Sequence, residues 1–124
     1  MNHAGFSTEK LLAMRALVDQ VYVDEQVSAY IVRLVFATRD PGALAPQLKP
    51  LIRFGASPRA SINLSLAAKA LAFLHGRPHV TPADIKAIAP DVLSHRVLTT
   101  FEADADRVTS EQIVRQVLDA VPVP

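Results

Sequence analysis

The residue with the clearest potential for chemistry in this chain is an arginine that follows a glycine, a serine and a proline. The segment Gly55–Ala60 reads Gly-Ala-Ser-Pro-Arg-Ala and leads into a long apolar run. Ser57 is a typical helix N-cap and Pro58 suits the first helical position, so the segment predicts the start of a helix. Arg59 then carries a positive charge in the first turn, where the helix dipole disfavours a cation. Because a helix N-terminus binds anions and an arginine adds a bidentate donor, Arg59 is a candidate ligand for phosphate or carboxylate.

The predicted helix continues to about Leu74, and Gly76 is placed to end it. Its apolar side chains cover a wide arc, which predicts a central helix with a broad buried face. They are Ile62, Leu64, Leu66, Ala67, Ala70, Leu71, Phe73 and Leu74. Asn63 lies four residues after Arg59, so the two side chains project from the same sector. Ser57, Pro58 and Asn63 are therefore possible supporting residues for an anion at Arg59. The alternative is a structural ion pair between Arg59 and a carboxylate of a neighbouring helix.

The other basic residues and the histidines give weaker indications of a functional site. Lys49 and Arg53, with Arg59 beyond them, make a small basic cluster that could face phosphates or form a solvated rim. His75 and His79 are four residues apart, but Gly76 and Pro78 interrupt the helix that would place them on one face, and no nearby carboxylate completes a ligand set. We therefore expect no metal site. A nucleophile formed by Ser57 and a histidine lacks an orienting carboxylate, and capping explains Ser57 better.

Composition excludes several classes of protein. The chain has 124 residues, no cysteine, and 13 Lys and Arg against 12 Asp and Glu, so we expect one domain without disulfides and no nucleic-acid-binding face. No signal segment or long apolar run is apparent in the sequence, which predicts a soluble, cytoplasmic protein with no membrane partner. The four glycines are isolated, so the phosphate-binding pattern G-x-x-x-x-G-K-[ST] is missing.

Caps and periodicity predict an all-α fold, a small helical bundle of four to five helices. Residues 1–6 have no pattern and are expected to be a disordered start, and residues 7–124 to form the domain. Besides the central helix, the expected helices begin at Ser7 or Thr8, at Asp24, at Thr81 and at Thr109. The helix from Asp24 should bury Val27, Tyr30, Ile31, Leu34 and Val35.

The remaining segments are expected to be irregular. Asp40–Phe54 holds three prolines and should form a long loop, and Glu102–Arg107 should be a polar loop. The helix from Thr81 should run to Pro90, and Asp91–Ser94 could add a short second turn before His95 and Arg96. Val97–Phe101 reads as extended and could pair with Ile52–Phe54 in a very short two-stranded ribbon.

The sequence also resembles the C-terminal part of MoxR-type AAA+ ATPases, from about Leu11 to Pro124 with gaps in the Asp40–Phe54 loop. The resemblance rests on the order and spacing of short motifs. They are Gly55–Ala60, Ala68–Ala72, Gly76-Arg77, Val80–Ile85, Val92-Leu93, His95-Arg96 and the ending Val121–Pro124.

This resemblance implies a helical lid that packs over the nucleotide of an AAA+ core, with Arg59 as the second sensor on the γ-phosphate side. The core, in the same or a neighbouring subunit, would supply the Walker loops, so ATP or ADP with Mg²⁺ would bind only with that core. The chain alone would then not be an enzyme, although it would be part of a chaperone-like remodelling ATPase. Ring size, the remodelled substrate, the presence of a core upstream in the native polypeptide and the role of His95 and Arg96 stay open.

A different class of function is a freestanding helical adaptor or helix-turn-helix module, in which the Gly76–Thr81 turn joins two packed helices. A DNA-reading helix should expose polar residues early in its sequence. Ala83, Ile85 and Ala87 are poor candidates for that task.

Overall fold

The computed structural model describes residues 8–124, so the expected disordered start at residues 1–6 lies outside the described residues. The elements in chain order are α1 (Thr8–Asp19), α2 (Glu25–Arg39), the 3-10 helix η2 (Pro46–Leu51), β1 (Ile52–Phe54), α3 (Ala60–Leu74), α4 (Pro82–Leu93), the 3-10 helix η3 (Ser94–Arg96), β2 (Leu98–Thr99), α5 (Phe101–Ala105) and α6 (Ser110–Ala120). This arrangement confirms the predicted helical fold.

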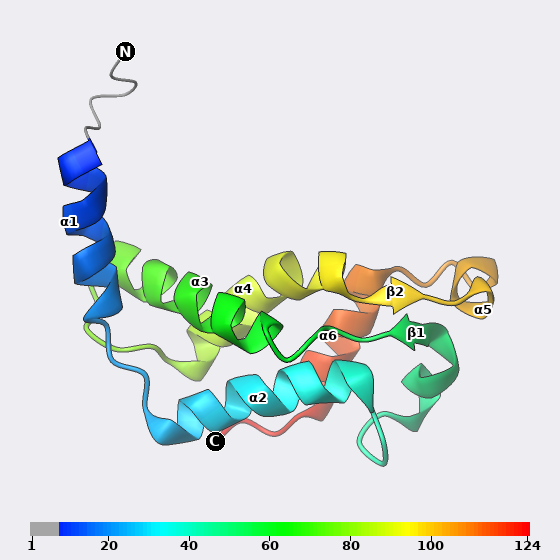
Figure 1. Ribbon diagram of the computed structural model, residues 1–124. Coiled ribbons are helices and arrows are strands. Elements are labelled where there is room, and N and C mark those ends of the chain that lie inside the picture. The colour runs from blue at the N-terminus through cyan, green and yellow to red at the C-terminus, as the bar shows by residue number, and fades with distance from the viewer. Residues whose placement is uncertain (1–7) are drawn as a thin grey trace.

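The domain is elongated, with α1 at one end and the β1–β2 ribbon with α5 at the other (Figure 1). Helix α3 packs mainly on α4 and also contacts α1 and α2. Helix α6 closes the core against α4 and α2. Among the described helices, none is long and apolar enough to cross a membrane.

Side-chain caps begin three of the helices where the sequence predicts them. Asp24 accepts a hydrogen bond from the Gln26 N–H, which starts α2. Thr81 and Asp84 form a reciprocal capping box at α4, and Thr109 forms the same motif with its third-position glutamine at α6. Caps of this kind satisfy N–H groups that have no partner inside the helix, so they fix the point at which each helix begins.

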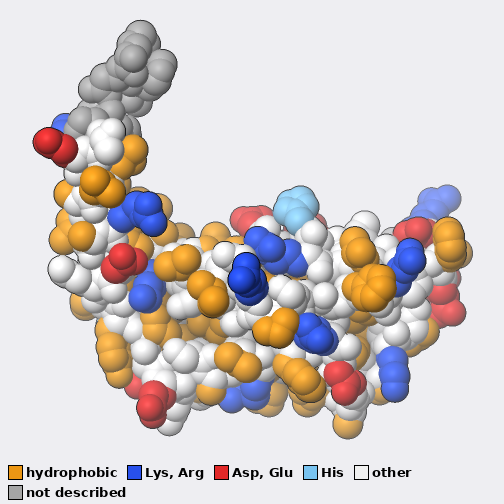
Figure 2. All heavy atoms as spheres, in the orientation of Figure 1, with side chains coloured by type: hydrophobic (Ala, Val, Ile, Leu, Met, Phe, Trp, Pro, Cys, Tyr) orange, Lys and Arg blue, Asp and Glu red, His pale blue; other side chains and the backbone are white. Residues whose placement is uncertain are grey.

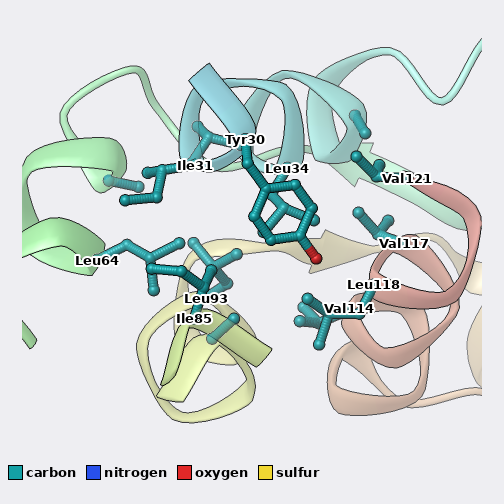
Figure 3. Close-up of a cluster of buried hydrophobic side chains, with 14 of the residues drawn as sticks. Tyr30, Ile31, Leu34, Leu64, Ile85, Leu93, Val114, Val117, Leu118 and Val121 are labelled. Carbon is teal, nitrogen blue, oxygen red and sulfur yellow. The ribbon is translucent and has the colours of Figure 1, made fainter. Parts of the chain in front are cut away.

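The core lies where α2, α3, α4 and α6 meet (Figure 3). The predicted buried face of α2 is confirmed, and Tyr30 at its centre is fully buried. The Tyr30 hydroxyl points toward α6 and has no hydrogen-bond partner within residues 8–124. Burial raises the Tyr30 pKa, while the positive charge of Arg33 acts in the opposite direction.

Helix α3 is central, but the prediction of its broad buried face is wrong. The fully buried residues are Ala60, Leu64, Ala68 and Ala72, at successive intervals of four. Leu74 is instead 75% exposed, and Leu71 is only partly buried. The reason is geometric. A stripe of alanines lets neighbouring helices approach closely, so this stripe faces the core. Apolar residues lie all around the helix, so the sequence alone does not indicate which stripe is buried.

Three boundaries differ from the predictions. Helix α4 continues through Pro90 to Leu93, so residues 91–93 belong to the same helix and do not form a separate short turn; the Ser94 hydroxyl donates to the Pro90 carbonyl. Pro90 is buried, so its ring contributes to the core although it removes one helical hydrogen bond. The predicted polar loop after Thr100 contains the short helix α5, because the Thr100 hydroxyl accepts from the Ala103 N–H. The segment Asp40–Phe54 is only partly loop, since it contains η2 and β1.

The short ribbon is confirmed. Strands β1 and β2 pair antiparallel, with Ile52 opposite Thr99 and Phe54 opposite Leu98. The Thr100 hydroxyl also donates to the Pro50 carbonyl at 2.8 Å, so the ribbon is linked to the end of η2. These contacts support a ribbon that would be marginal alone.

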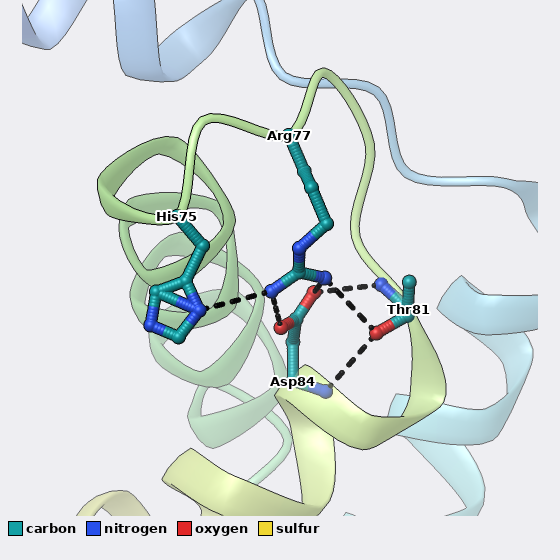
Figure 4. Close-up of polar contacts among 4 residues, drawn as sticks. All are labelled: His75, Arg77, Thr81 and Asp84. Carbon is teal, nitrogen blue, oxygen red and sulfur yellow. Dashed lines mark hydrogen bonds and ion pairs between the residues drawn. The ribbon is translucent and has the colours of Figure 1, made fainter.

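An ion pair anchors the turn between α3 and α4 (Figure 4). The Arg77 guanidinium donates to both Asp84 carboxylate oxygens, at 2.8 and 2.5 Å, and one of these oxygens also accepts from the Thr81 N–H. Burial alone raises the pKa of Asp84, but the hydrogen bonds from Arg77 and Thr81 together with the Arg77 charge hold that pKa below its ordinary value. The carboxylate therefore serves the capping box and the ion pair at once.

The Asp84 site predicts a dependence of stability on acid. Because the pKa of Asp84 is lower in the folded chain, its contribution is complete above the unfolded pKa of about 3.9 and is lost as the pH falls through the folded pKa. We expect Asp84→Asn to lower the free energy of unfolding at neutral pH and to flatten its decline below about pH 4. Urea denaturation at a series of pH values measures this. Glu111→Gln, in the exposed pair with Arg115, is the control and should leave the profile parallel to that of the parent. An Asp84→Asn profile parallel to the parent would contradict the assignment.

The buried stripe of α3 predicts a contrast between two leucines of one helix. Leu64→Ala should lower the free energy of unfolding by about 2–5 kcal/mol, because it leaves a cavity in the core. Leu74→Ala should change it by less than about 0.5 kcal/mol, because that side chain is largely in solvent. Thermal melting of both variants decides the point, and equal losses would mean that the buried face is wrongly placed.

Candidate functional site

Arg59 lies in a turn that leads directly into α3. The Ala60 N–H donates to the Ser57 carbonyl at 2.9 Å and the Ser61 N–H to the Pro58 carbonyl at 3.2 Å, so the chain enters the helix through a tight turn. Arg59 occupies the N-cap position with helical backbone angles, φ −62° and ψ −25°. The prediction of Ser57 as a side-chain N-cap is wrong, since α3 has no side-chain cap and begins two residues later than the sequence suggests. The N–H groups of the first turn donate to backbone carbonyls in place of a side-chain cap: those of Ile62 and Asn63 both donate to the Arg59 carbonyl, at 3.0 and 3.3 Å.

The Arg59 side chain is exposed and available. Within residues 8–124 it forms neither an ion pair nor a side-chain hydrogen bond, so the alternative of a structural ion pair has no partner there. Ser57 and Pro58 are exposed beside it, and Asn63 is half-buried one turn further along α3. The turn thus presents a cation, the helix N-terminus and a polar amide on neighbouring positions.

A buried threonine holds this turn in place. The Thr38 hydroxyl, in the last turn of α2, donates to the Val35 carbonyl at 2.6 Å and accepts from the Ala56 N–H at 3.0 Å. Thr38 and Ala56 are both fully buried. Gly55 lies so close to the Thr38 carbonyl that any Cβ at this position would overlap it. We call this set of contacts among Thr38, Gly55 and Ala56 the Thr38 clamp.

The clamp joins the end of α2 to the beginning of the Arg59 turn. Its hydroxyl carries the only side-chain hydrogen bond to the Ala56 N–H within the described chain. The sequence alone gives Thr38 no role, although a threonine at the end of an apolar helical stripe is a signal for a backbone-bonding hydroxyl. The clamp is therefore the part of the site that sequence reasoning misses.

A hollow of about 300 Å³ opens beside the turn, between α2 and the start of α3. Its lining residues are Val32, Val35, Phe36, Arg39, Pro58 and Ser61. The lining is mainly apolar, and Arg39 adds a second cation near Arg59 in this part of the domain.

The other candidate residues lie elsewhere. Lys49 is in the last turn of η2, and the Arg53 guanidinium lies 5.6 Å from the centre of the Phe54 ring in β1. Both are exposed, and their role in facing phosphates stays a prediction. His75 contacts the Arg77 guanidinium at 3.4 Å, and no group of metal-ligating residues occurs within residues 8–124.

The Thr38 clamp predicts a specific loss of stability. Thr38→Val keeps the shape of the side chain but leaves the buried Ala56 N–H without its partner, which should cost about 1–3 kcal/mol. Thr38→Ser retains the hydroxyl and is the matched control, with a smaller loss expected. Urea denaturation compares the three proteins. A valine variant as stable as the parent would show that the hydroxyl does not hold the turn.

Comparison with known proteins identifies the domain. A family model described as the AAA lid domain matches residues 45–117. The chain is 40% identical over 119 residues to the chaperone MoxR1 of Mycobacterium tuberculosis, covering 95% of this chain and 32% of that protein. It is 32% identical over 116 residues to the protein MoxR of Methylorubrum extorquens, covering 88% of this chain and 34% of that protein.

A solved structure shows the same architecture. The crystal structure of a candidate ATPase from Cytophaga hutchinsonii superposes with a TM-score of 0.89 at 38% identity, over 94% of this chain and 36% of that one. The chain thus spans about a third of the length of these relatives. Because the family model covers more than half of the chain and the relatives carry the MoxR name, the chain belongs to the AAA lid domain family and is a lid domain of the MoxR type.

Proposed function

We propose that this lid presents Arg59, as the second sensor, to the γ-phosphate side of an ATP molecule held by an AAA+ core. The observation that carries the proposal is the free Arg59 side chain on a turn fixed by the Thr38 clamp. An arginine that carries no ion pair within residues 8–124 and lies at the positive end of a helix dipole is available to bind an anion.

The chain does not hydrolyse ATP alone under this proposal. Its sequence contains no G-x-x-x-x-G-K-[ST] loop to cradle the β- and γ-phosphates. The core of the same or a neighbouring subunit provides that loop and the groups that bind Mg²⁺. Ser57, Pro58 and Asn63 flank Arg59 and support its orientation. ATP or ADP with Mg²⁺ is thus a ligand of the lid and core together.

Electrostatics explains what Arg59 contributes. Charge on the transferred phosphoryl group and the leaving oxygens must be stabilised during hydrolysis, and a positioned guanidinium does this without reorganisation. Arg59 therefore acts on the ATP-bound state more than on the ADP-bound state, because ADP lacks the group that it contacts. Nucleotide hydrolysis then changes the contact between lid and core.

The wider role follows from the relatives. One of them is named a chaperone, so we assign this lid to a chaperone-like remodelling ATPase that works in the cytoplasm. Its partner is an AAA+ core, and neither nucleic acid nor a membrane is part of this proposal. The helix-turn-helix alternative is less well supported, since the lid family model covers the α3–α4 turn on which that alternative depends.

The test uses a chimera in which this chain replaces the matching segment of M. tuberculosis MoxR1. Arg59→Gln in this MoxR1 chimera should slow ATP turnover by about 100-fold or more, the range for losing one preorganised donor, while ADP affinity changes little. In the isolated chain the same substitution should change the free energy of unfolding by less than about 0.5 kcal/mol, because the side chain is exposed and unpaired.

Lys86→Gln, at an exposed position on α4, is the matched control and should leave turnover unchanged. Unchanged turnover in the Arg59→Gln chimera, or unfolding of the isolated chain, would contradict the sensor role.

A further inference from the structure

Arg39, the last residue of α2, is a second exposed arginine beside the Arg59 turn. It lines the hollow of about 300 Å³ on the α2 side, whereas Pro58 and Ser61 line the side where α3 begins. Arg59 directly follows Pro58 in the chain. An arginine therefore flanks the hollow on each of its two sides.

The Thr38 clamp fixes the two arginine-bearing segments to each other. Thr38 directly precedes Arg39, and its hydroxyl accepts from the Ala56 N–H, three positions before Arg59. Gly55 packs against the Thr38 carbonyl and the Arg39 backbone nitrogen so closely that a Cβ would overlap both. The backbones that carry Arg39 and Arg59 are thus in direct contact through the clamp, which holds the two residues at a constant separation.

Neither arginine is neutralised by this chain. Within residues 8–124 Arg39 forms no ion pair and no side-chain hydrogen bond, as is the case for Arg59, although the exposed Asp40 follows it in the chain. The described residues that line the hollow include no carboxylate. Figure 2 shows lysine and arginine side chains over the middle of this face, where Figure 1 places α3 and the turn leading into it, whereas aspartate and glutamate side chains lie mainly toward the edges. The dipole of α2 favours a cation in its last turn, but two unpaired cations beside one hollow also attract an anion.

The number of positive charges limits the kind of anion. One carboxylate carries a single negative charge, and its two oxygens satisfy one guanidinium. A polyphosphate chain carries several charges on successive groups, so each arginine can bind a phosphate of its own. A pair of arginines held at a constant separation therefore fits a di- or triphosphate better than a lone carboxylate.

We propose that Arg39 is a second phosphate-binding arginine of this site, which contacts a phosphate of the bound nucleotide other than the γ-phosphate assigned to Arg59. The inference rests on the proposed function, because an AAA+ core must bring the nucleotide to the Arg59 turn. The two arginines flank the hollow from different sides, so they reach different phosphates. Arg39 then contacts a group that ATP and ADP share, and it contributes to nucleotide affinity, whereas Arg59 contributes to turnover.

Steady-state kinetics and titration with a fluorescent ADP in the MoxR1 chimera test the proposal. Arg39→Gln should raise the KM for ATP and the Kd for ADP about tenfold or more, the range for losing a charge-assisted hydrogen bond. The kcat should change by less than about threefold, because a contact made equally in the ground state and the transition state affects binding alone.

Two further variants are matched controls. Arg39→Lys keeps the charge and should recover part of the ADP affinity, because a lysine binds phosphate as a point charge. Arg115→Gln removes an exposed arginine on α6 and should leave KM, kcat and ADP affinity unchanged. Unchanged ADP affinity in Arg39→Gln, or an equal loss in Arg115→Gln, would overturn the proposal.

Adenosine separates a phosphate contact from a contact with the core. It lacks phosphates, so its affinity, measured by competition with the fluorescent ADP, should be the same in the parent chimera and in Arg39→Gln. An equal loss of affinity for adenosine and ADP would show that Arg39 supports the site through a protein contact, and the proposal would fail.

A second measurement covers the case in which the chimera does not fold. The isolated chain is titrated with inorganic tripolyphosphate, and binding is followed by the NMR chemical shifts of the backbone amides. Amides around Arg39 and Arg59 should shift, and the affinity should fall about threefold or more in Arg39→Gln and in Arg59→Gln but not in Arg115→Gln. Acetate at the same ionic strength, the probe for a single carboxylate, should cause smaller shifts. Equal affinities of the parent and Arg39→Gln for tripolyphosphate, or the absence of shifts, would contradict the assignment.

The outcomes distinguish this inference from the sensor proposal. Turnover slowed by Arg59→Gln, with an ADP affinity insensitive to Arg39→Gln, refutes the Arg39 assignment alone. An ADP affinity lowered by Arg39→Gln, with turnover insensitive to Arg59→Gln, supports the Arg39 assignment and refutes the sensor role alone.

Discussion

The Arg59 turn depends on one buried hydroxyl. The Thr38 hydroxyl donates a hydrogen bond to the Val35 carbonyl in its own helix and accepts one from the Ala56 N–H, 18 positions further along the chain. Leaving the buried Ala56 N–H without a partner would cost more free energy than a hydrogen bond usually contributes, so this contact holds the segment against α2. Gly55 makes the contact possible, because a side chain at this position would collide with the Thr38 carbonyl. The two residues before the turn are thereby fixed to α2, and α3 starts from a defined point.

Helix α3 carries apolar side chains on more than one side, and only one stripe of them is fully buried within the domain. Its alanine stripe and Leu64 face the domain, where small side chains allow close helix packing. Ile62 and Leu66 remain exposed on a different side, next to hollows that adjoin α1 and α2.

Local signals in the sequence are sufficient for much of this fold. The capping boxes at Thr81 and Thr109, the Asp24 cap and the buried face of α2 depend on residues within a few positions of one another, so they could be predicted. The buried side of α3 could not, because apolar residues surround it and only packing selects among them. In the sequence, Pro90 indicates the end of a helix, but the helix continues past it. Burial of the proline ring offsets the helical hydrogen bond that is lost because proline has no N–H. For the candidate site, the unfavourable charge at Arg59 predicts an anion ligand, and that role stays a prediction. The Thr38 clamp joins residues 18 positions apart, so a local pattern cannot indicate which N–H the hydroxyl binds.

The central claim is that the clamp holds Arg59 in position for ATP turnover, and a double-mutant cycle tests it most directly. Four MoxR1 chimeras make up the cycle: the parent, Thr38→Val, Arg59→Gln and the double variant. If the clamp acts through Arg59, Thr38→Val slows turnover in the presence of Arg59 and has little further effect once Arg59→Gln is in place. The same slowing by Thr38→Val in both backgrounds would contradict the claim, because the clamp would then serve the fold independently of Arg59.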